Sequence, residues 1–260
     1  MRIMTCNIRT SAAWDEENNW CRRRDLCCDV IRSRGPDVVG CQEVREDQAA
    51  DLIAAFSEFG SYGLPDEPGG AHPMNLVLFR RETFRLLSAG GFWLSETPHV
   101  PGSTSWDSAC IRLANWVQLL HKEAGAEVLV INTHLDHKSQ AAREGQARVI
   151  NEWAAAFPDE QVRILAGDLN ANPDNAVIRC FKEAGWRSTY EAVHGAANPG
   201  CTCHGFLGND PSKDHEPWAR KIDWVFLKGR AKVVAAEIVR DSRDGRYPSD
   251  HYFLAVELEI

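Results

Sequence analysis

Residues 128–137 read Val-Leu-Val-Ile-Asn-Thr-His-Leu-Asp-His, so a continuous apolar run gives way to polar side chains. A short apolar run rich in β-branched residues predicts a strand that is buried on both faces. The strand expected over 163–166 repeats this arrangement, because it leads into Gly167-Asp168-Leu169-Asn170. Residues 139–157, between the two strands, have the apolar spacing of a helix. Together they predict a layered α/β fold with polar residues at its strand ends, where such folds bind ligands.

The rest of the chain predicts more elements of the same kind. Apolar strands are expected over 2–8 and 37–42, and each leads into a helix, over 19–34 and 45–59. Asn19 suits the first helix as a cap, and Gly35-Pro36 ends it. Further strands are expected over 75–79, 84–94, 110–121, 127–132, 221–227, 233–239 and 252–260, with a helix that Asp174 or Asn175 caps and that ends near Ala184. Because no linker, repeat or change of composition divides the chain, residues 1–260 are expected to form a single domain.

Composition and charge exclude several classes of protein. The chain has 260 residues, of which 44% are hydrophobic, and its 29 basic and 37 acidic side chains leave a net charge of −8. These values exclude a disordered, collagen-like or coiled-coil chain. The negative charge argues against a protein that holds nucleic acid mainly by neutralising phosphates. A phosphate-bearing substrate would therefore need local cations, either side chains or a metal ion.

The sequence also predicts where the protein acts. No apolar run approaches the roughly 18 residues of a membrane span, so no membrane partner is expected. Nine cysteines are an odd number in a chain too long to need a disulfide scaffold. This count favours reduced thiols and a cytoplasmic location, and a signal peptide removed before the first residue stays open as the alternative. Cys6, Cys41 and Cys110 lie in apolar runs and are expected in the core.

Several predicted strands end in residues able to hold a metal ion or a phosphate. These are Asn7, Gln42-Glu43, Asn132-Thr133-His134, Asp168-Leu169-Asn170, Asp223 and Ser249-Asp250-His251. Each alone has a plainer explanation, since Asp or Asn after a strand is usually a turn residue or a helix cap. Asp223 is harder to explain in this way, because an ionised carboxylate in an apolar strand is costly unless it has a partner. The order and spacing of the whole set are the specific signal.

That ordered set resembles the endonuclease/exonuclease/phosphatase superfamily, which has the deoxyribonuclease I-like fold. Residues 92–98, 106–112 and 132–137 are similar to a bacterial branch of metal-dependent hydrolases related to nocturnin and the deadenylases. The resemblance runs from the first predicted strand to the last. It implies a four-layer α/β/β/α sandwich, in which two mixed β-sheets pack face to face with helices outside.

The resemblance also implies roles for the residues of the set. It makes Glu43 the principal ligand of Mg²⁺ or Mn²⁺, with Asn7 and Asp250 close to the ion, and oxygen ligands of this kind suit a hard cation. It makes His251 the general base, or an electrostatic partner of the phosphate, oriented by Asp223. The remaining catalytic candidates are Asp168, which orients or deprotonates the attacking water, and Asn170, His134 and Arg112, which bind phosphate oxygens. His137, His204 and Trp106 are candidates for substrate contact.

The function expected from these roles is that of a divalent-metal-dependent phosphoesterase. It would hydrolyse a phosphodiester or phosphomonoester of a small nucleotide-, sugar- or lipid-like substrate by in-line attack of water. The fold does not choose among substrates, so a 3′-end exonuclease or an endonuclease acting on RNA or DNA remains an alternative. A non-catalytic module that binds a phosphorylated ligand is the alternative from another class.

Two further features have both a plain and a functional interpretation. Trp14, Trp106 and Trp218 fall in polar loops, where an aromatic ring could stack on a base or a sugar or could simply pack against the protein. The triplet Arg22-Arg23-Arg24 lies on the helix expected over 19–34 and is interpreted as a solvated helix face.

Overall fold

The computed structural model describes residues 1–70, 72, 74–196, 200–208 and 221–260. One six-stranded sheet contains β1 (Arg2–Asn7), β2 (Val38–Gln42), β3 (Phe59–Tyr62), β4 (Val77–Arg80), β11 (Lys232–Val239) and β12 (Phe253–Glu259). The other contains β5 (Phe84–Trp93), β6 (Leu113–His121), β7 (Glu127–His134), β8 (Val162–Asp168), β9 (Arg187–Ser188) and β10 (Asp223–Lys228). The helices are α1 (Trp20–Ser33), α2 (Glu46–Ala55), α3 (Gln140–Ala154), α4 (Ala176–Glu183) and α5 (Thr189–His194), with a 3₁₀ turn at Glu16–Asn18.

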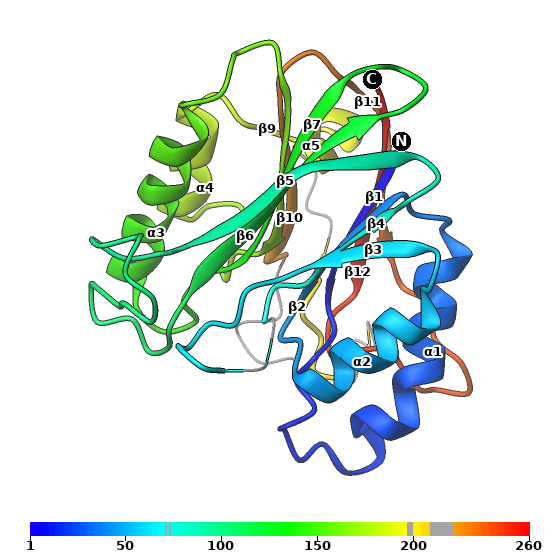
Figure 1. Ribbon diagram of the computed structural model, residues 1–260. Coiled ribbons are helices and arrows are strands. Elements are labelled where there is room, and N and C mark those ends of the chain that lie inside the picture. Colours follow the sequence, from blue (N-terminus) through cyan, green and yellow to red (C-terminus); the bar gives the residue numbers. More distant parts are fainter. Residues whose placement is uncertain (71, 73, 197–199, 209–220) are drawn as a thin grey trace.

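Helices flank two sheets that face each other, which gives four layers (Figure 1), and an apolar cluster fills each of the three spaces between layers. The central cluster lies between the sheets and includes Ile3, Val128 and Ile164. A second cluster packs α1 and α2 against the outer face of the first sheet, and a third packs α3 and α4 against the outer face of the second. The predicted α/β/β/α sandwich of two mixed sheets is confirmed.

The strand pairing explains why polar residues meet at one end of the sandwich. The first sheet has the order β11-β12-β1-β2-β4-β3 and the second β5-β6-β7-β8-β10-β9. Each sheet contains one parallel pair among the described strands, β1 with β2 and β7 with β8, and the carboxyl ends of such a pair lie at the same edge. Asn7 is therefore opposite Gln42, and His134 is opposite Asp168. Antiparallel β10 brings Asp223 opposite Asp168 from the other side.

Two glycines allow the close approaches that this arrangement needs. A Cβ on Gly167 would collide with the carbonyl oxygen of Thr133, so the residue before Asp168 has to be glycine. A Cβ on Gly40 would lie 2.8 Å from the side-chain oxygen of Asn132, which occupies the space above that glycine. Both positions lie just beneath the strand ends that carry the polar set.

Several local predictions were wrong. The second helix ends at Ala55, not residue 59, because Phe59 begins β3 and packs edge-on against Phe56 with ring centroids 5.6 Å apart. β9 and α5 were not predicted, because elements of two and six residues are too short to show a period.

Smaller corrections concern a helix cap and a cysteine. The side chain of Asn19 accepts the N–H of Asp15 instead of capping α1, whereas Asn175 caps α4 as predicted by accepting the N–H of Val177. Cys6 and Cys41 are buried, but Cys110 is exposed, because the strand expected over 110–121 begins at Leu113. Within the described residues, no helix is long and apolar enough to cross a bilayer.

Candidate active site

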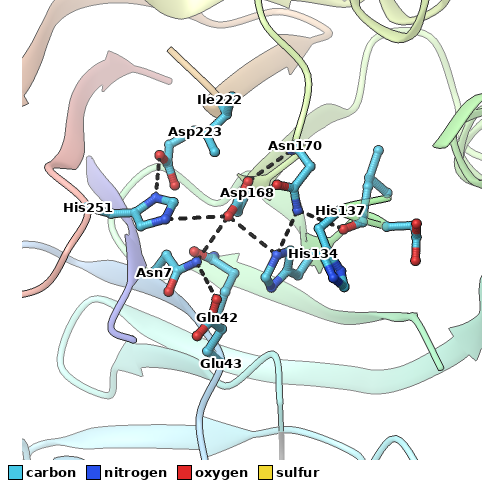
Figure 2. A network of polar contacts seen from close by, with 12 residues as sticks. Asn7, Gln42, Glu43, His134, His137, Asp168, Asn170, Ile222, Asp223 and His251 are labelled. Atoms are coloured by element: carbon cyan, nitrogen blue, oxygen red, sulfur yellow. Dashed lines mark hydrogen bonds and ion pairs between the residues drawn. The ribbon is translucent and has the colours of Figure 1, made fainter. Parts of the chain in front are cut away.

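The strand ends of the two sheets meet at Asn7 (Figure 2). Its side-chain amide donates to Glu43 Oε1 and to Asp168 Oδ2, each at 3.0 Å. Glu43 follows β2 of the first sheet, and Asp168 ends β8 of the second. One amide group therefore links the carboxylates of both sheets, which is the convergence that the predicted site requires.

Glu43 has an unfavourable backbone conformation that its surroundings maintain. Its φ is +64°, in the left-handed region that is uncommon for residues other than glycine. The N–H of Thr10 donates to its Oε2 at 3.0 Å, which fixes the second oxygen of the carboxylate. Strain of this kind concentrates at functional sites, where surrounding bonds maintain it.

Asp250 lies beside this pair. Burial raises the pKa of Asp250, and the nearby carboxylate of Glu43 raises it further. The hydroxyl of Ser249 donates to the backbone carbonyl of Asn7 at 2.7 Å, which ties the segment before β12 to the end of β1. The three residues predicted to surround the metal, Asn7, Glu43 and Asp250, are thus neighbours.

A buried acid–imidazole cluster lies on the other side of Asn7. His251 Nδ1 is 2.9 Å from Asp223 Oδ2, and His251 Nε2 is 3.9 Å from Asp168 Oδ2. Burial, and then the neighbouring Asp223, raise the pKa of Asp168 to about 7. Burial alone would lower the pKa of His251, but Cys203 and Asp223 together hold it well above its ordinary value. Asp223 therefore has the partner that its place in an apolar strand requires.

Hydrogen-bond donors face the acids from the second sheet. His134 Nε2 is 2.9 Å from Asn170 Nδ2 and 3.3 Å from Asp168 Oδ2. Burial and then Arg112 hold the pKa of His134 well below its ordinary value, so this imidazole is neutral at pH 7. Arg112 is buried, and its Nη2 lies 3.3 Å from Nδ1 of the exposed His137. Among the described residues, Arg112 Nε and His134 Nδ1 are buried without a hydrogen-bond partner.

The model of the endonuclease/exonuclease/phosphatase family matches residues 4–251. The chain belongs to this family. A family member from Bacteroides vulgatus is 29% identical to it with a TM-score of 0.89, and the match covers 100% of this chain and 98% of the other. The mannosyl-6-phosphatase of Bacteroides thetaiotaomicron is 25% identical with a TM-score of 0.85, and all of both chains is covered.

More distant relatives share the fold. The catalytic domain of human nocturnin is 20% identical with a TM-score of 0.77, and the match covers 100% of this chain and 94% of the other. A curated relative from Acanthamoeba polyphaga mimivirus, an uncharacterized protein, is 24% identical over 165 residues. The chain spans about 60% of the length of that relative, and the match includes 59% of this chain.

Enzymes of this family usually use divalent metal ions, and the acidic cluster fits a cation. Ligand atoms of Asp168, Asp223 and His251 all lie within 4.8 Å of one another. Two carboxylates at about that separation repel each other by roughly 3 kcal/mol at an effective dielectric of 20. Within the described part of the chain, Asp223 Oδ1 is buried and has no hydrogen-bond partner. A buried acid oxygen without a donor, beside a second carboxylate, is what a cation would neutralise; this cluster is separate from Glu43, Asn7 and Asp250, the residues that the family resemblance places around the metal.

Two substrate candidates pack against the protein. The ring of His204 is 1% exposed and lies against Tyr252 and Tyr247, with centroids 4.0 and 4.7 Å apart, so it is a packed residue and not the substrate contact that we expected. Trp106 is half-buried with its ring over Gly145 of α3, where a Cβ would lie 2.5 Å from the ring, so one face packs on the helix and its contact with substrate stays a prediction. Trp14 is 83% exposed, and Trp218 lies outside the described residues.

Arg9 is a charged residue of the site that sequence reasoning missed. Its guanidinium makes two bonds of 2.9 Å to Asp15 and lies 3.7 Å from Asp250 Oδ2. The signal was its position two residues after Asn7, in the loop that leaves β1 at the site. A cation beside Asp250 reduces the repulsion between that carboxylate and Glu43.

Proposed function

We propose that this protein is a divalent-metal-dependent phosphoesterase that hydrolyses a small phosphorylated substrate by in-line attack of water. The observation that carries the proposal is the arrangement around Asp168. Its carboxylate lies between the Asp223–His251 pair on one side and His134 on the other. Side chains that can accept a proton from water therefore lie on one side of Asp168, and side chains that can donate hydrogen bonds to a phosphate group lie on the other.

The acids and His251 suit the handling of the attacking water. Asp223 accepts a hydrogen bond from Nδ1 of His251, which orients the ring and leaves Nε2 directed toward Asp168. A pKa of about 7 gives the Asp168 carboxyl group the basicity of a general base near neutral pH. Water between Asp168 and His251 would transfer its proton to the Asp168 carboxylate as its oxygen attacks phosphorus, and the His251 imidazolium, whose pKa is raised, would stabilise the charge that develops.

The donors of the second sheet suit the phosphate. His134 would donate from Nδ1 to a non-bridging oxygen, and Arg112 would pair with the charge that gathers there. The unpartnered Nε of Arg112 and Nδ1 of His134, both buried among the described residues, support this role. Asn170 donates to Nε2 of His134 and to the carbonyl of Leu135, so it would hold the tautomer of His134 that carries its proton on Nδ1. Glu43, Asn7 and Asp250 would hold the metal ion, which when bound stabilises negative charge on the phosphoryl group.

A phosphorylated sugar or a similarly small compound is the substrate class that we favour. The chain has a net charge of −8, which disfavours steering toward a nucleic-acid backbone. A solved relative at 25% identity over its whole length is a mannosyl-6-phosphatase, which supports the same class. The cytoplasmic location stays a prediction from the odd number of cysteines.

The proposal is tested with purified protein and a panel of phosphate esters. The panel contains aryl phosphomonoesters and diesters, sugar phosphates including mannose 6-phosphate, nucleotides and short oligonucleotides, with Mn²⁺, Mg²⁺ or excess chelator. We expect metal-dependent hydrolysis of a small ester and at least a hundredfold loss in His251→Gln. His121→Gln is the control, because that imidazole packs on Phe84 at the end of β6 that lies away from Arg112 and the site. Binding without turnover across the panel would favour the non-catalytic module, and preference for oligonucleotides would favour the nuclease.

A further inference from the structure

Arg23, in the first turn of α1, departs from the solvated helix face that the sequence predicts. The side chains of Arg22 and Arg24 are 50% and 43% exposed and pair with nearby acids on the surface. Arg23 is only 2% exposed. Burial lowers the pKa of Arg23, but guanidinium is basic enough to remain charged. A buried positive charge in the middle of an exposed triplet needs an explanation from its contacts.

Among the described residues, the hydrogen bonds of this guanidinium all end on backbone carbonyl oxygens. Its Nη1 donates to Ile8 at 2.6 Å and to Pro248 at 2.9 Å, and its Nη2 donates to Arg9 at 2.7 Å. Its Nε donates to Asn18 at 2.8 Å. Within the described residues it forms no direct ion pair with a carboxylate, so its hydrogen bonds all go to carbonyl dipoles, while the nearby Asp250 and Asp15 favour its charge from a distance.

Three of these four carbonyl groups, those of Ile8, Arg9 and Pro248, belong to the two segments that carry the first-sheet half of the site. Ile8 and Arg9 follow directly after Asn7, and Pro248 comes two residues before Asp250. The ladder between β1 and β12 ends at the pair Thr5 and Leu254, so the site residues lie beyond it.

Beyond the end of that ladder, hydrogen bonds from side chains join the two segments. Among the described residues, the carbonyl bonds of Arg23 and the 2.7 Å bond from the Ser249 hydroxyl to Asn7 span the two segments there. The planar guanidinium reaches both segments at once, which a lysine ammonium with its point charge and different reach would do less well.

We propose that Arg23 is a positioning residue that sets the spacing between Asn7 on one segment and Asp250 and His251 on the other. It contacts neither substrate nor metal, and it acts through the backbone of both segments. The inference rests on the proposed function, because the spacing matters for the affinity of the metal ion and for the rate of hydrolysis. Partners of this kind that orient the residues of a metal site typically change metal affinity 10- to 100-fold when they are altered.

Arg163 offers a matched control. It is also 2% exposed, and its guanidinium donates to the backbone carbonyls of Ala154 at 2.9 Å and Phe157 at 3.1 Å. It lies at the start of β8, at the opposite end of that strand from Asp168. Loss of this buried arginine should cost stability without reaching the site.

The experiment compares Arg23→Lys with Arg163→Lys in the full chain. Mn²⁺ binding is measured by calorimetry without substrate, thermal stability by melting, and kcat and KM with the best ester of the panel. We expect Arg23→Lys to weaken Mn²⁺ binding about tenfold or more and to lower kcat with little change in KM. Arg163→Lys should lower the melting temperature and leave metal affinity and kcat near wild type. Equal effects of both variants, or unchanged Mn²⁺ affinity in Arg23→Lys, would overturn the inference.

A second variant separates the two proposals and guards against misfolding. Ser249→Ala removes the hydrogen bond from the Ser249 hydroxyl to the carbonyl of Asn7, and we expect it to weaken Mn²⁺ binding in the same direction as Arg23→Lys. If wild type binds Mn²⁺ and hydrolyses no ester, the proposed function fails alone, because the metal affinities of the variants still test Arg23. If wild type hydrolyses an ester and Arg23→Lys matches it in metal affinity and kcat, the inference about Arg23 fails alone. Wild-type protein that binds no Mn²⁺ would overturn both.

Discussion

The metal-free protein should lose stability as the pH rises through neutrality, and Asp168 should be a main cause. The pKa of Asp168 is raised by burial and Asp223 from 3.8 to about 7 in the folded state. The native protein therefore binds more protons than the unfolded chain between these values, and stability must fall with rising pH in that window. His251, whose folded pKa is also raised, adds stability below its unfolded value of about 6.5 and loses it at higher pH. Both groups act in the same direction. The lowered folded pKa of His134 acts in the opposite direction below its unfolded value of about 6.5, so the effect of Asp168 is measured as the difference between wild type and Asp168→Asn.

The size of the effect follows from the pKa of Asp168. At pH 5 the folded carboxyl group lies about two pH units below its pKa and is protonated, while the unfolded group is already ionised. At pH 8 both are ionised. Asp168 alone should therefore account for a loss of roughly 3 kcal/mol in the free energy of unfolding between pH 5 and pH 8.

Urea unfolding in excess chelator at pH 5 and pH 8 measures this loss. Asp168→Asn carries no titrating group at the position, so its loss should be smaller than that of wild type by about 3 kcal/mol. Asp37→Asn is the control, because that carboxylate bonds Thr83 and the N–H of Arg2 at the other end of β2. Saturating Mg²⁺ should reduce the wild-type loss, since a cation favours the ionised carboxylate. The same pH dependence in Asp168→Asn and wild type would refute the reasoning.

Three other substitutions give separate predictions. Asp223→Asn should lower kcat about 10- to 100-fold, because His251 loses a buried charge-assisted bond worth about 1.5–3 kcal/mol; initial rates with Mn²⁺ measure it, and a loss under threefold would contradict the pairing. Asn132→Leu should lower the free energy of unfolding by about 3 kcal/mol in urea, because it removes three buried hydrogen bonds, with Gln42 and with the carbonyls of Cys41 and Leu76; a loss below about 1 kcal/mol would contradict that account. Arg112→Lys should raise KM about tenfold and change kcat less, because a lysine lacks the planar donor fork that matches a phosphate; unchanged KM would show that the guanidinium does not touch substrate.

The elements that bury whole apolar runs could be predicted from the sequence. The strand over 128–132 and the strand over 163–166 appear in the structure as the inner parts of β7 and β8. Their signal is strong because a strand between two layers is apolar on both faces. The same reasoning places a polar residue that follows such a run at the edge of the sheet, and that is where Asp168 lies. That the polar residues at the ends of different strands converge on one site was expected from the family resemblance, since periodicity alone does not say which strands become neighbours.

The burial of Arg23 could not be predicted in this way. Its neighbours on either side are arginines of identical local propensity, and the pattern of α1 does not distinguish them. What buries it is the meeting of three carbonyl groups from residues 8, 9 and 248, which the chain brings together only after both sheets have formed. The predicted substrate contact of His204 was wrong for a related reason, because the tyrosines that cover its ring come from a segment more than 40 residues away in the sequence.

Hydrogen bonds between the two sheets explain how the distances between site residues on different sheets are fixed. Apolar packing fills the space between the sheets but has no direction, so it does not by itself set how one sheet is placed along the other. Below the site, the side-chain amide of Gln42 donates to Asn132 Oδ1 at 2.7 Å, and Asn132 Nδ2 donates to backbone carbonyls of the first sheet's segment at 2.9 and 3.0 Å. Directional bonds inside a dry core are costly to leave unmade, so a shift of one sheet along the other would break all three at once. The distance from Glu43 on one sheet to Asp168 on the other is therefore controlled by residues that touch no substrate, and the acidic cluster keeps its geometry despite its own repulsion.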